Sequence, residues 1–488
     1  MPVHRLLVRL PPLAIVAGLA LAGCMMGPTY HRPAVATPVS FKEADGWAPA
    51  NPSSAADRAD WWTAFGDPVL NDLEDRVASS NFTLAADAAI YTQAHELVIE
   101  DRAALFPSIN LTPNISATYS GAKGGATVVT GSGIAAGAAG GSTTTIYQPA
   151  ISGSWAPDFW GGVRRTIQSA RATAQADAAT LADARLTLQT ELATDYVSLR
   201  QLDQEKRLYD AEIAALQKSL GVVQNQYRSG NAPRSSYLTA VTTLKGAQAA
   251  AIDLARQRAL MEHAIALLVG VPPAQFSLAP APWTLNLPQL PAAVPSTLLQ
   301  RRPDIAQAER AAASANAFIG VQVAAFFPTI NLTGDGGGES STLAHVFRAS
   351  NLFWTVGASA SEPVFDAGLH LARYRAAKAA YDQAVANYRE TVLTAFGNVE
   401  DNLAAQRVYA TEVGAVNEET KAAVENQTIS LNEYEAGTVD YTTVAAAEQA
   451  ALNAQVAQVS LQASQLATAV SLIESLGGGW TTKELPKG

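Results

Sequence analysis

The chain has 488 residues, of which 48% are hydrophobic and only 16% are charged, and its formal net charge is −10. Because nucleic-acid binding depends on clustered Lys and Arg, this acidic balance argues against a nucleic acid as partner. Cys24 is the single cysteine, and a chain without any other thiol suits an oxidising compartment.

Residues 1–23 are predicted to be a lipoprotein signal peptide. Arg5 and Arg9 precede an apolar stretch, Leu10 to Ala22, that is too short and too interrupted to span a membrane. It ends in Leu-Ala-Gly-Cys, which resembles a bacterial lipobox, so Cys24 is the predicted site of lipidation. An ordinary secretory signal followed by a chance cysteine is the alternative.

The residue after Cys24 indicates which membrane holds the anchor. In bacterial lipoproteins an Asp at this place usually signals retention at the inner membrane, and here the residue is Met25. We therefore expect attachment to the outer membrane. No later stretch approaches 18 uninterrupted apolar residues, so no transmembrane helix is predicted.

The chain contains an internal repeat. Three segments recur in the same order: LFPSINLT at 105–112 and FFPTINLT at 326–333, WAPDFWGGV at 155–163 and EPVFDAGL at 362–369, and Tyr-x-x-Gly at 227–230 and 434–437. They indicate a duplicated half of roughly 210 residues, a period far too long for a solenoid unit.

Each half contains two segments in which apolar and small polar residues alternate. They cover residues 109–120 and 147–155 in the first half, and residues 330–333 and 351–360 in the second. Alternating segments of about ten residues with aromatic residues near their ends are typical of transmembrane barrel strands. A soluble sandwich with one wet face is the alternative. The Gly-rich runs between the paired segments, from Gly121 to Ser142 and from Gly334 to Ser350, are predicted to be hairpin loops.

Four strands in lipid would leave two unpaired sheet edges, which is prohibitive, so the strands must close with those of other chains. The strand count predicts an oligomer but not the number of subunits. In the last strand, alternation predicts one face toward lipid, made of Leu352, Trp354, Val356 and Ala358, and one toward the lumen, made of Thr355, Gly357 and Ser359.

The remaining segments have the periodicity of long helices. Apolar residues from Tyr374 to Leu403 recur at about 3.6 residues, which predicts a nearly straight helix. Long helices are expected over 164–227 and 369–434, and each is followed by a second helix, over 233–269 and 441–476. Gly230 and Gly437 are the predicted C-cap residues of the long helices.

The sequence contains no constellation of catalytic or metal-binding residues. The six His residues have no metal-ligand spacing, and His95-Glu96 lacks the second His of a zinc helix. No G-x-S-x-G elbow is present. Gly334 to Gly338 (GDGGG) opens no helix, so it is predicted to be a flexible loop and not a phosphate cradle. A passive conduit without a cofactor is expected. A surface enzyme or adhesin on a barrel has no supporting feature.

Five motifs follow one another along the chain: CMMGPTYHRP at 24–33, DWWTAFGDPVL at 60–70, LLVGVPP at 267–273, LQRRPDI at 299–305, and Tyr-x-x-Gly at both helical turns. This set resembles the outer-membrane factor (TolC-like) family, and specifically the lipoprotein branch that serves resistance-nodulation-division (RND) pumps, the NodT-type outer-membrane efflux lipoproteins. The motif residues Trp61, Trp62, Arg301 and Asp304 are expected to stabilise the fold, pack the belt and cap helices, and not to contact substrate.

The resemblance implies an α+β homotrimer. Four strands from each chain would form a twelve-stranded outer-membrane β-barrel, continued by a periplasmic barrel of twelve helices with a belt around its middle. The expected boundaries are 1–23 for the signal peptide, 24–60 for the anchor and belt segment, 61–270 for the first repeat (β-hairpin about 106–156, helical hairpin about 158–270), 271–296 for a Pro-rich connector, 297–476 for the second repeat (β-hairpin about 327–362, helical hairpin about 364–476) and 477–488 for the tail.

The resemblance also implies a function. The chain would be the exit channel of a tripartite RND-type efflux system, which passes drugs or other small toxic compounds from an inner-membrane pump and a periplasmic adaptor to the exterior. The channel of a one-step (type I) protein secretion system, which shares the fold, is the alternative. The lipobox and the RRPDI motif at 301–305 favour efflux.

The resemblance places a periplasmic gate just past the second Tyr-x-x-Gly turn. The positions that often carry acidic residues there are Thr443 and Ala446, so the usual acidic ring is missing. Asp440 and Glu448 are the candidate acidic residues to replace it. The predicted gate residues, from helical spacing, are Asp440, Tyr441, Thr443, Ala446 and Ala447, with Tyr441 packing sideways. Asp440 as the N-cap of the following helix is the alternative. The predicted adaptor-docking turns contain Tyr227, Gly230, Tyr434 and Gly437.

Overall fold

A computed structural model describes residues 25–44, 60–121, 128–130, 133–135, 142–288 and 300–486. Cys24 lies outside the described residues, so its lipidation stays a prediction. The chain divides into two compact units. Unit 1 comprises Met1–His31, His95–Ala172 and Ala313–Gln383, and unit 2 comprises Arg32–Ala94, Thr173–Ala312 and Ala384–Gly488.

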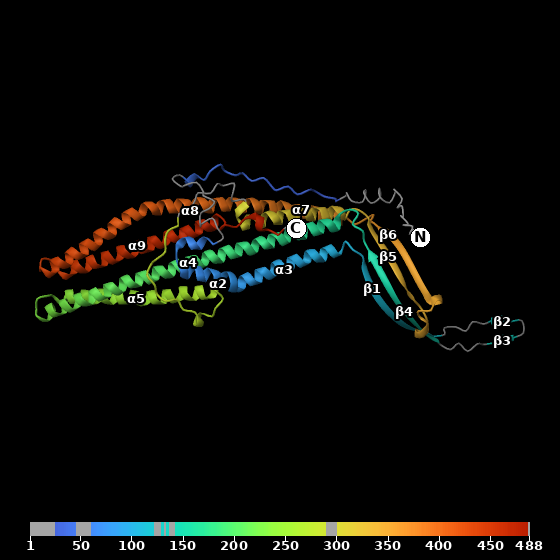
Figure 1. The fold of residues 1–488 in the computed structure, drawn as a ribbon, viewed down its shortest axis with the longest axis horizontal. Helices are drawn as coiled ribbons and strands as arrows, with labels where there is room; N and C mark the ends of the chain where they lie inside the picture. The colour runs from blue at the N-terminus through green and yellow to red at the C-terminus, as the bar shows by residue number, and fades with distance from the viewer. Residues whose placement is uncertain are drawn as a thin grey trace, which may run out of the picture. The chain divides into compact units, whose positions relative to one another are not determined.

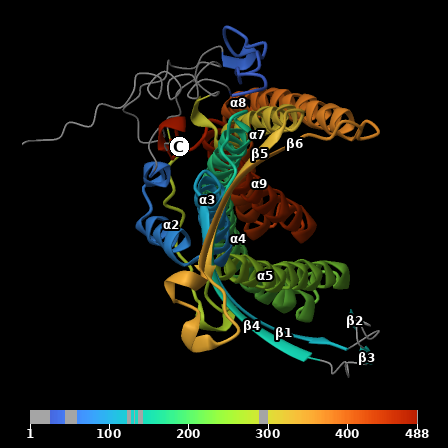
Figure 2. The same ribbon diagram turned by 90° about the vertical axis from the view of Figure 1, so that its right-hand side faces the viewer.

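Unit 1 contains a four-stranded antiparallel sheet. Its strands are β1 (Ser108–Ser120), β4 (Ser142–Trp155), β5 (Thr329–Gly338) and β6 (Leu352–Ser361), in the order β1-β4-β5-β6 (Figures 1 and 2). The short strands β2 (Val128–Thr130) and β3 (Gly133–Ala135), which come between β1 and β4 in the sequence, pair with each other in a separate sheet. The sheet is open within one chain, with β1 and β6 at its edges. The predicted α+β class with four long strands is confirmed.

The register of the sheet places most of the large apolar residues of the four strands on one face. Leu111 pairs with Ile151, Ile151 with Gly336, and Gly336 with Trp354. Residues that pair directly lie on the same face of a sheet, so this row is apolar from one edge to the other. Leu111 is 72% exposed and Trp354 is 78% exposed. The neighbouring row, on the other face, is polar and consists of Asn110, Ser152, Asp335 and Thr355.

The prediction of a loop from Gly334 to Ser350 was wrong at its start, because β5 continues through Gly338. Glycine has no side chain, so this part of the strand cannot show the alternation that identifies a strand in a sequence. In the structure, two of these glycine positions have no room for a side chain. A Cβ on Gly337 would lie 2.3 Å from the carbonyl oxygen of Pro149, and one on Gly338 would lie 2.1 Å from that of Val346. In the first hairpin, β4 likewise begins at Ser142, before the predicted residue 147.

Seven α-helices are described, and six of them form three pairs of equal length. The helices are α2 (Pro68–Ser80), α3 (Phe82–Ala103), α4 (Gly162–Arg228), α5 (Arg234–Leu268), α7 (Pro303–Ala324), α8 (Leu369–Glu435) and α9 (Tyr441–Ser475). Both α3 and α7 have 22 residues, α4 and α8 have 67, and α5 and α9 have 35. These matched lengths are what a duplicated half produces. Short 3-10 helices lie at Lys42–Ala44, Trp61–Phe65, Pro273–Gln275, Leu343–His345, Ala349–Asn351 and Thr482–Glu484.

The core of unit 2 is built on the predicted helical stripes. Tyr388, Val392 and Val399 of α8 are buried, and they belong to one cluster with Leu192 and Tyr196 of α4. The cluster also contains the aromatic side chains Trp61, Trp62 and Phe65.

A buried polar network crosses this core. Asp67, the N-cap of α2, accepts a hydrogen bond from the Tyr196 hydroxyl at 2.7 Å. Arg200 donates to the same hydroxyl at 3.0 Å and pairs with Asp203 at 2.9 Å. Arg258 of α5 completes the network by pairing with Asp203 at 2.7 Å. Each buried charge thus has a partner, which offsets its desolvation cost.

One described helix, α9, is long and apolar enough to cross a membrane by length and composition, although no uninterrupted apolar run predicts it. Of its most apolar stretch, 44% is buried inside the structure. Leu466, Val470 and Ile473 of α9 belong to the core cluster of unit 2. We therefore interpret α9 as a core helix.

Candidate functional site at the helical turns

The two helical hairpins of unit 2 reverse direction at the predicted Tyr-x-x-Gly turns (Figure 1). Gly230 and Gly437 have φ angles of 80° and 75°, in the left-handed region that only glycine adopts without strain. The Gly230 amide donates to the Tyr227 carbonyl at 3.1 Å, and the Gly437 amide donates to the Tyr434 carbonyl at 3.0 Å. The predicted C-cap role of both glycines is confirmed.

The aromatic residues of the turns join the two hairpins. Tyr227 stacks on Tyr237 within the first hairpin, with ring centroids 5.7 Å apart. Tyr434 packs edge-on against Tyr441 within the second, and its hydroxyl donates to the Gln226 side chain of the first. The end of unit 2 that contains both turns is therefore one connected aromatic and polar structure.

Asp440 is the N-cap of α9, as the capping alternative predicts. Its side chain accepts hydrogen bonds from the backbone amides of Thr442 at 2.9 Å and Thr443 at 3.2 Å. These bonds, the Thr442 hydroxyl first among them, lower the pKa of the carboxyl group. Because the carboxylate is exposed, capping does not prevent it from facing a lumen.

The other predicted gate residues divide between two sides of α9. Thr443 and Ala446 are exposed, as a lumen-facing stripe requires. Tyr441 is buried, in agreement with its predicted sideways packing. Ala447 is only 4% exposed, so it lies on the packed side of the helix and its assignment to the exposed stripe was wrong. It follows Val444 by three positions and therefore shares that residue's buried face.

Glu448 is also buried, at 2% exposure, and so cannot replace the missing acidic ring. The Ser219 hydroxyl donates to its Oε1 at 3.3 Å, whereas its Oε2 and the Tyr441 hydroxyl have no hydrogen-bond partner among the described residues. Burial raises the pKa of Glu448. Burial first, and then the charge of Glu448, raise the pKa of Glu212 to about 7. Sequence reasoning missed Glu212, because nothing local distinguishes it from other glutamates on α4.

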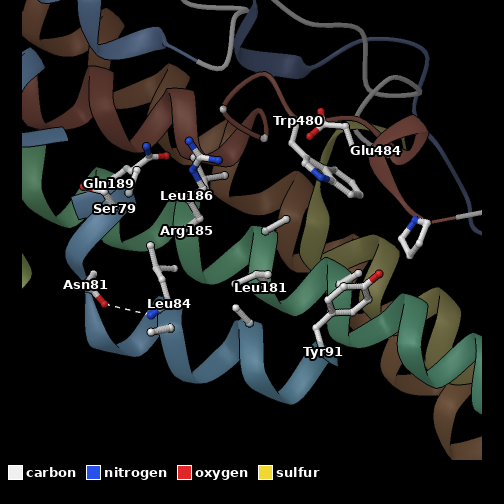
Figure 3. Close-up of a pocket in the computed structure, with 18 residues that line it drawn as sticks. Ser79, Asn81, Leu84, Tyr91, Leu181, Arg185, Leu186, Gln189, Trp480 and Glu484 are labelled. Carbon is white, nitrogen blue, oxygen red and sulfur yellow. Dashed lines mark hydrogen bonds between the residues drawn. The ribbon is translucent and has the colours of Figure 1, made fainter. Parts of the chain in front are cut away.

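A cavity of about 590 Å³ lies elsewhere in unit 2, among α2, α3, α4 and the C-terminal segment (Figure 3). Its walls are mostly apolar, with Leu84, Leu181 and Trp480 among them, and Arg185 and Gln189 supply polar groups. No group of three or more His, Cys, Asp or Glu side chains that could hold a metal ion occurs in the described part of the chain. Nothing in the cavity has the arrangement of a catalytic site.

The signature residues pack the fold, as expected. Arg302 donates to the Ser475 carbonyl at the end of α9, at 2.9 Å, and pairs with Asp304 at 2.6 Å. Asp304 lies in the first turn of α7. Gly477 approaches the same motif so closely that a Cβ would lie 2.0 Å from the Arg301 carbonyl oxygen. Trp61 and Trp62 are both buried in the core cluster.

The fold and the turns have counterparts among known proteins. A family model described as "outer membrane efflux protein" matches residues 73–271 and 294–478. The pyoverdine export outer membrane protein OpmQ of Pseudomonas aeruginosa is 28% identical over 475 residues, which are 96% of each chain. The cation efflux system protein CusC of Escherichia coli is 27% identical over 480 residues, covering 96% of this chain and 98% of the relative.

Solved structures agree with these relatives. The outer-membrane channel OprN superimposes with a TM-score of 0.84 at 27% identity, covering 94% of this chain and all of its own. The MtrE outer membrane channel of Neisseria gonorrhoeae, solved in an open state, gives a TM-score of 0.82 at 25% identity, with 94% and 99% of the two chains covered.

Proposed function

The chain belongs to the outer membrane efflux protein family, and we propose that three copies of it form the exit channel of a tripartite RND-type efflux system. Its family makes it an outer-membrane efflux channel and not an enzyme. The proposed partners are a periplasmic adaptor and an inner-membrane RND pump, and the proposed cargo is small toxic compounds. The proposed location is the outer membrane of a Gram-negative bacterium, with a lipid anchor at Cys24 and an extension into the periplasm.

The observation that carries the proposal is the open sheet with one apolar face. Its exposed row of Leu111, Ile151 and Trp354 suits hydrocarbon, and the opposite row suits water. In lipid, the unpaired backbone groups of β1 and β6 would each cost several kcal/mol. Closure of β6 on β1 of the next copy removes both edges. A ring of three chains gives about twelve strands, a size known for outer-membrane barrels.

The proposed route for cargo fits a conduit that selects little. The polar face of the sheet carries small neutral side chains, such as Asn110, Ser152 and Thr355, with a single acidic group at Asp335. Such a wall offers no built recognition site, so selection belongs to the pump. We propose that the adaptor docks at the turns of Tyr227 to Gly230 and Tyr434 to Gly437, which lie at one end of unit 2 (Figure 1).

Two measurements test the proposal. Mass measurement of the detergent-purified protein should give three copies per particle, and a folded monomer that is stable for days would refute closure between chains. Deletion of the gene should then raise susceptibility to small toxic compounds at least fourfold, and the intact gene should restore resistance. Loss of a secreted protein with unchanged susceptibility would instead support the type I secretion alternative.

A further inference from the structure

A second cavity, of about 510 Å³, lies in unit 1 between the end of α3 and the first turns of α4. Its polar wall contains Arg102, Arg164, Arg171 and Gln168. Its apolar wall contains Met25, Leu105, Phe106 and Ile167. No acidic side chain lines it, although Glu100 and Asp101 immediately precede Arg102 on α3. The cavity is therefore lined by cationic and apolar side chains together.

Two of the three guanidinium groups are available to a ligand. Arg164 is paired with Asp158 at 3.0 Å, and its charge is balanced there. The Nε atom of Arg171 is buried without a hydrogen-bond partner among the described residues. Among the residues that the structure describes, no carboxylate forms a salt bridge with Arg102. A buried donor without a partner is costly, and two cations facing one hollow attract an anion.

The apolar wall is continuous with the apolar face of the sheet. Phe106 is 70% exposed and stands just before β1, whose first apolar side chain is Ile109. Trp155, at the end of β4, donates from its indole nitrogen to the Leu105 carbonyl at 3.0 Å. Aromatic residues of this kind concentrate where an outer-membrane barrel meets the headgroup layer.

The first described residues of the chain complete the cavity. Arg165 donates to the carbonyls of Met26 at 2.8 Å and Gly27 at 3.0 Å. Gly27 has a φ angle of 94°, and a Cβ there would lie 2.4 Å from the Cα of Gly320. This tight docking fixes Met25 as part of the apolar wall.

We propose that this cavity binds the phosphate group of an anionic phospholipid from the periplasmic leaflet of the outer membrane. Arg102 and Arg171 hold the phosphate oxygens, and an acyl chain lies along Phe106 toward Ile109. Gln168 supports the site, because its Oε1 already accepts from Arg165 at 2.8 Å and its amide nitrogen remains as a donor. The inference rests on the proposed function, since it takes the apolar face of the sheet to lie in the membrane.

The second repeat retains only part of this positive charge. By the equal lengths of the paired helices, Val323 of α7 occupies the place of Arg102, whereas Lys378 of α8 occupies the place of Arg171. The first turns of α8 carry Arg373 and Arg375, which are exposed and do not line this cavity. These two residues provide a control with the same change of charge.

The test is a titration of the delipidated, detergent-solubilised full-length protein with dioleoyl phosphatidylglycerol, followed by native mass spectrometry. The unmodified protein should bind one lipid per chain. The double variant Arg102→Gln/Arg171→Gln should bind it at least tenfold more weakly, and the control Arg373→Gln/Arg375→Gln should stay within twofold of the unmodified protein. Arg102→Gln alone, at an exposed helix end, should weaken binding about threefold and serves if the double variant does not fold.

Three results would overturn the proposal. Equal weakening in both double variants would mean diffuse attraction to a basic surface. Displacement of the lipid by inorganic phosphate at the same concentration would mean a simple anion site. An oligomer of the proposed size that binds no phosphatidylglycerol would remove this inference and leave the channel proposal intact, whereas a stable monomer would remove the channel proposal itself.

Discussion

Asp440 combines two properties at one residue, because it caps α9 through backbone amides and keeps its carboxylate exposed. Asp440→Asn preserves a side-chain acceptor for the cap and removes the charge, whereas Asp440→Ala removes both. We expect Asp440→Ala to cost about 1 kcal/mol of stability, and Asp440→Asn to cost much less. Thermal unfolding of both variants measures this difference.

The same pair of variants reports on the gate. If Asp440 lines the lumen, Asp440→Asn should lower cation selectivity or divalent block in single-channel recordings, because three carboxylates close together attract cations. Unaltered conductance and selectivity would leave Thr438 to Ala446 as a steric, weakly polar constriction. Opening would then depend on the adaptor at the turns.

Glu212 should make the packing of the helical hairpins sensitive to pH. Its pKa is about 7 in the folded protein against an ordinary value of 4.5, so the folded state favours the protonated carboxyl. The contribution of protonated Glu212 to the free energy of unfolding is fully present below pH 4.5 and is lost as pH rises through 7. The charged and polar groups that act on Glu212 are Glu448 on α9 and Gln427 on α8.

Glu212→Gln should therefore raise the unfolding temperature by a few degrees at pH 8 and have little effect at pH 4.5. Glu433, which is exposed at the end of α8, provides the control Glu433→Gln. Calorimetry at both pH values measures the difference. A Glu212→Gln variant that parallels the control across this range would contradict the assigned burial.

At the scale of elements, the sheet makes a prediction that depends on its register. Val356 shares a face with Ile151 through Gly334 and Gly153, whereas Thr355 lies on the polar face. Val356→Arg should cost about 2 to 4 kcal/mol if the residue lies near the bilayer midplane, and Thr355→Arg should cost much less. Unfolding of the barrel from lipid vesicles by urea measures both penalties. Similar penalties would reverse the assignment of lipid and lumen faces.

The elements also show where prediction from sequence succeeds. Long helices were predicted to within about two residues at their ends, because a 3.6-residue stripe and a C-cap glycine are both local signals. The end of β5 was missed because five residues containing four glycines carry no pattern. Pro149, which is distant in the chain, and Val346, which follows the strand, leave no room for a side chain there.

At the scale of the whole molecule, the lipid anchor is predicted to be at Cys24 alone. Mass spectrometry of the mature protein should find acyl groups at this residue, and Cys24→Ala should lose both the acyl mass and processing of the lipoprotein type. Mature protein without lipid at residue 24 would refute the lipobox. With another signal peptide supplied, the oligomer should still form, because the helices bury far more apolar area than an acyl chain contributes.

The periodic elements, the duplication and the reversal points at Gly230 and Gly437 could all be predicted from the amino-acid sequence. These features are local, since a side-chain period or a glycine cap can be identified without knowing what packs against it. The need for other chains also followed from sequence, because four strands cannot close a sheet in lipid.

Which side of a helix is buried, and which distant residues meet, depend on how the elements pack. Ala447 and Glu448 lie on the packed side of α9 because of the hairpin against which they pack. The cavity of Arg102 and Arg171 exists because two helices, separated by a β-hairpin in sequence, flank Met25. The burial and the electrostatic environment of a residue at such a place depend on neighbours from several segments. The sequence of one segment therefore cannot predict them.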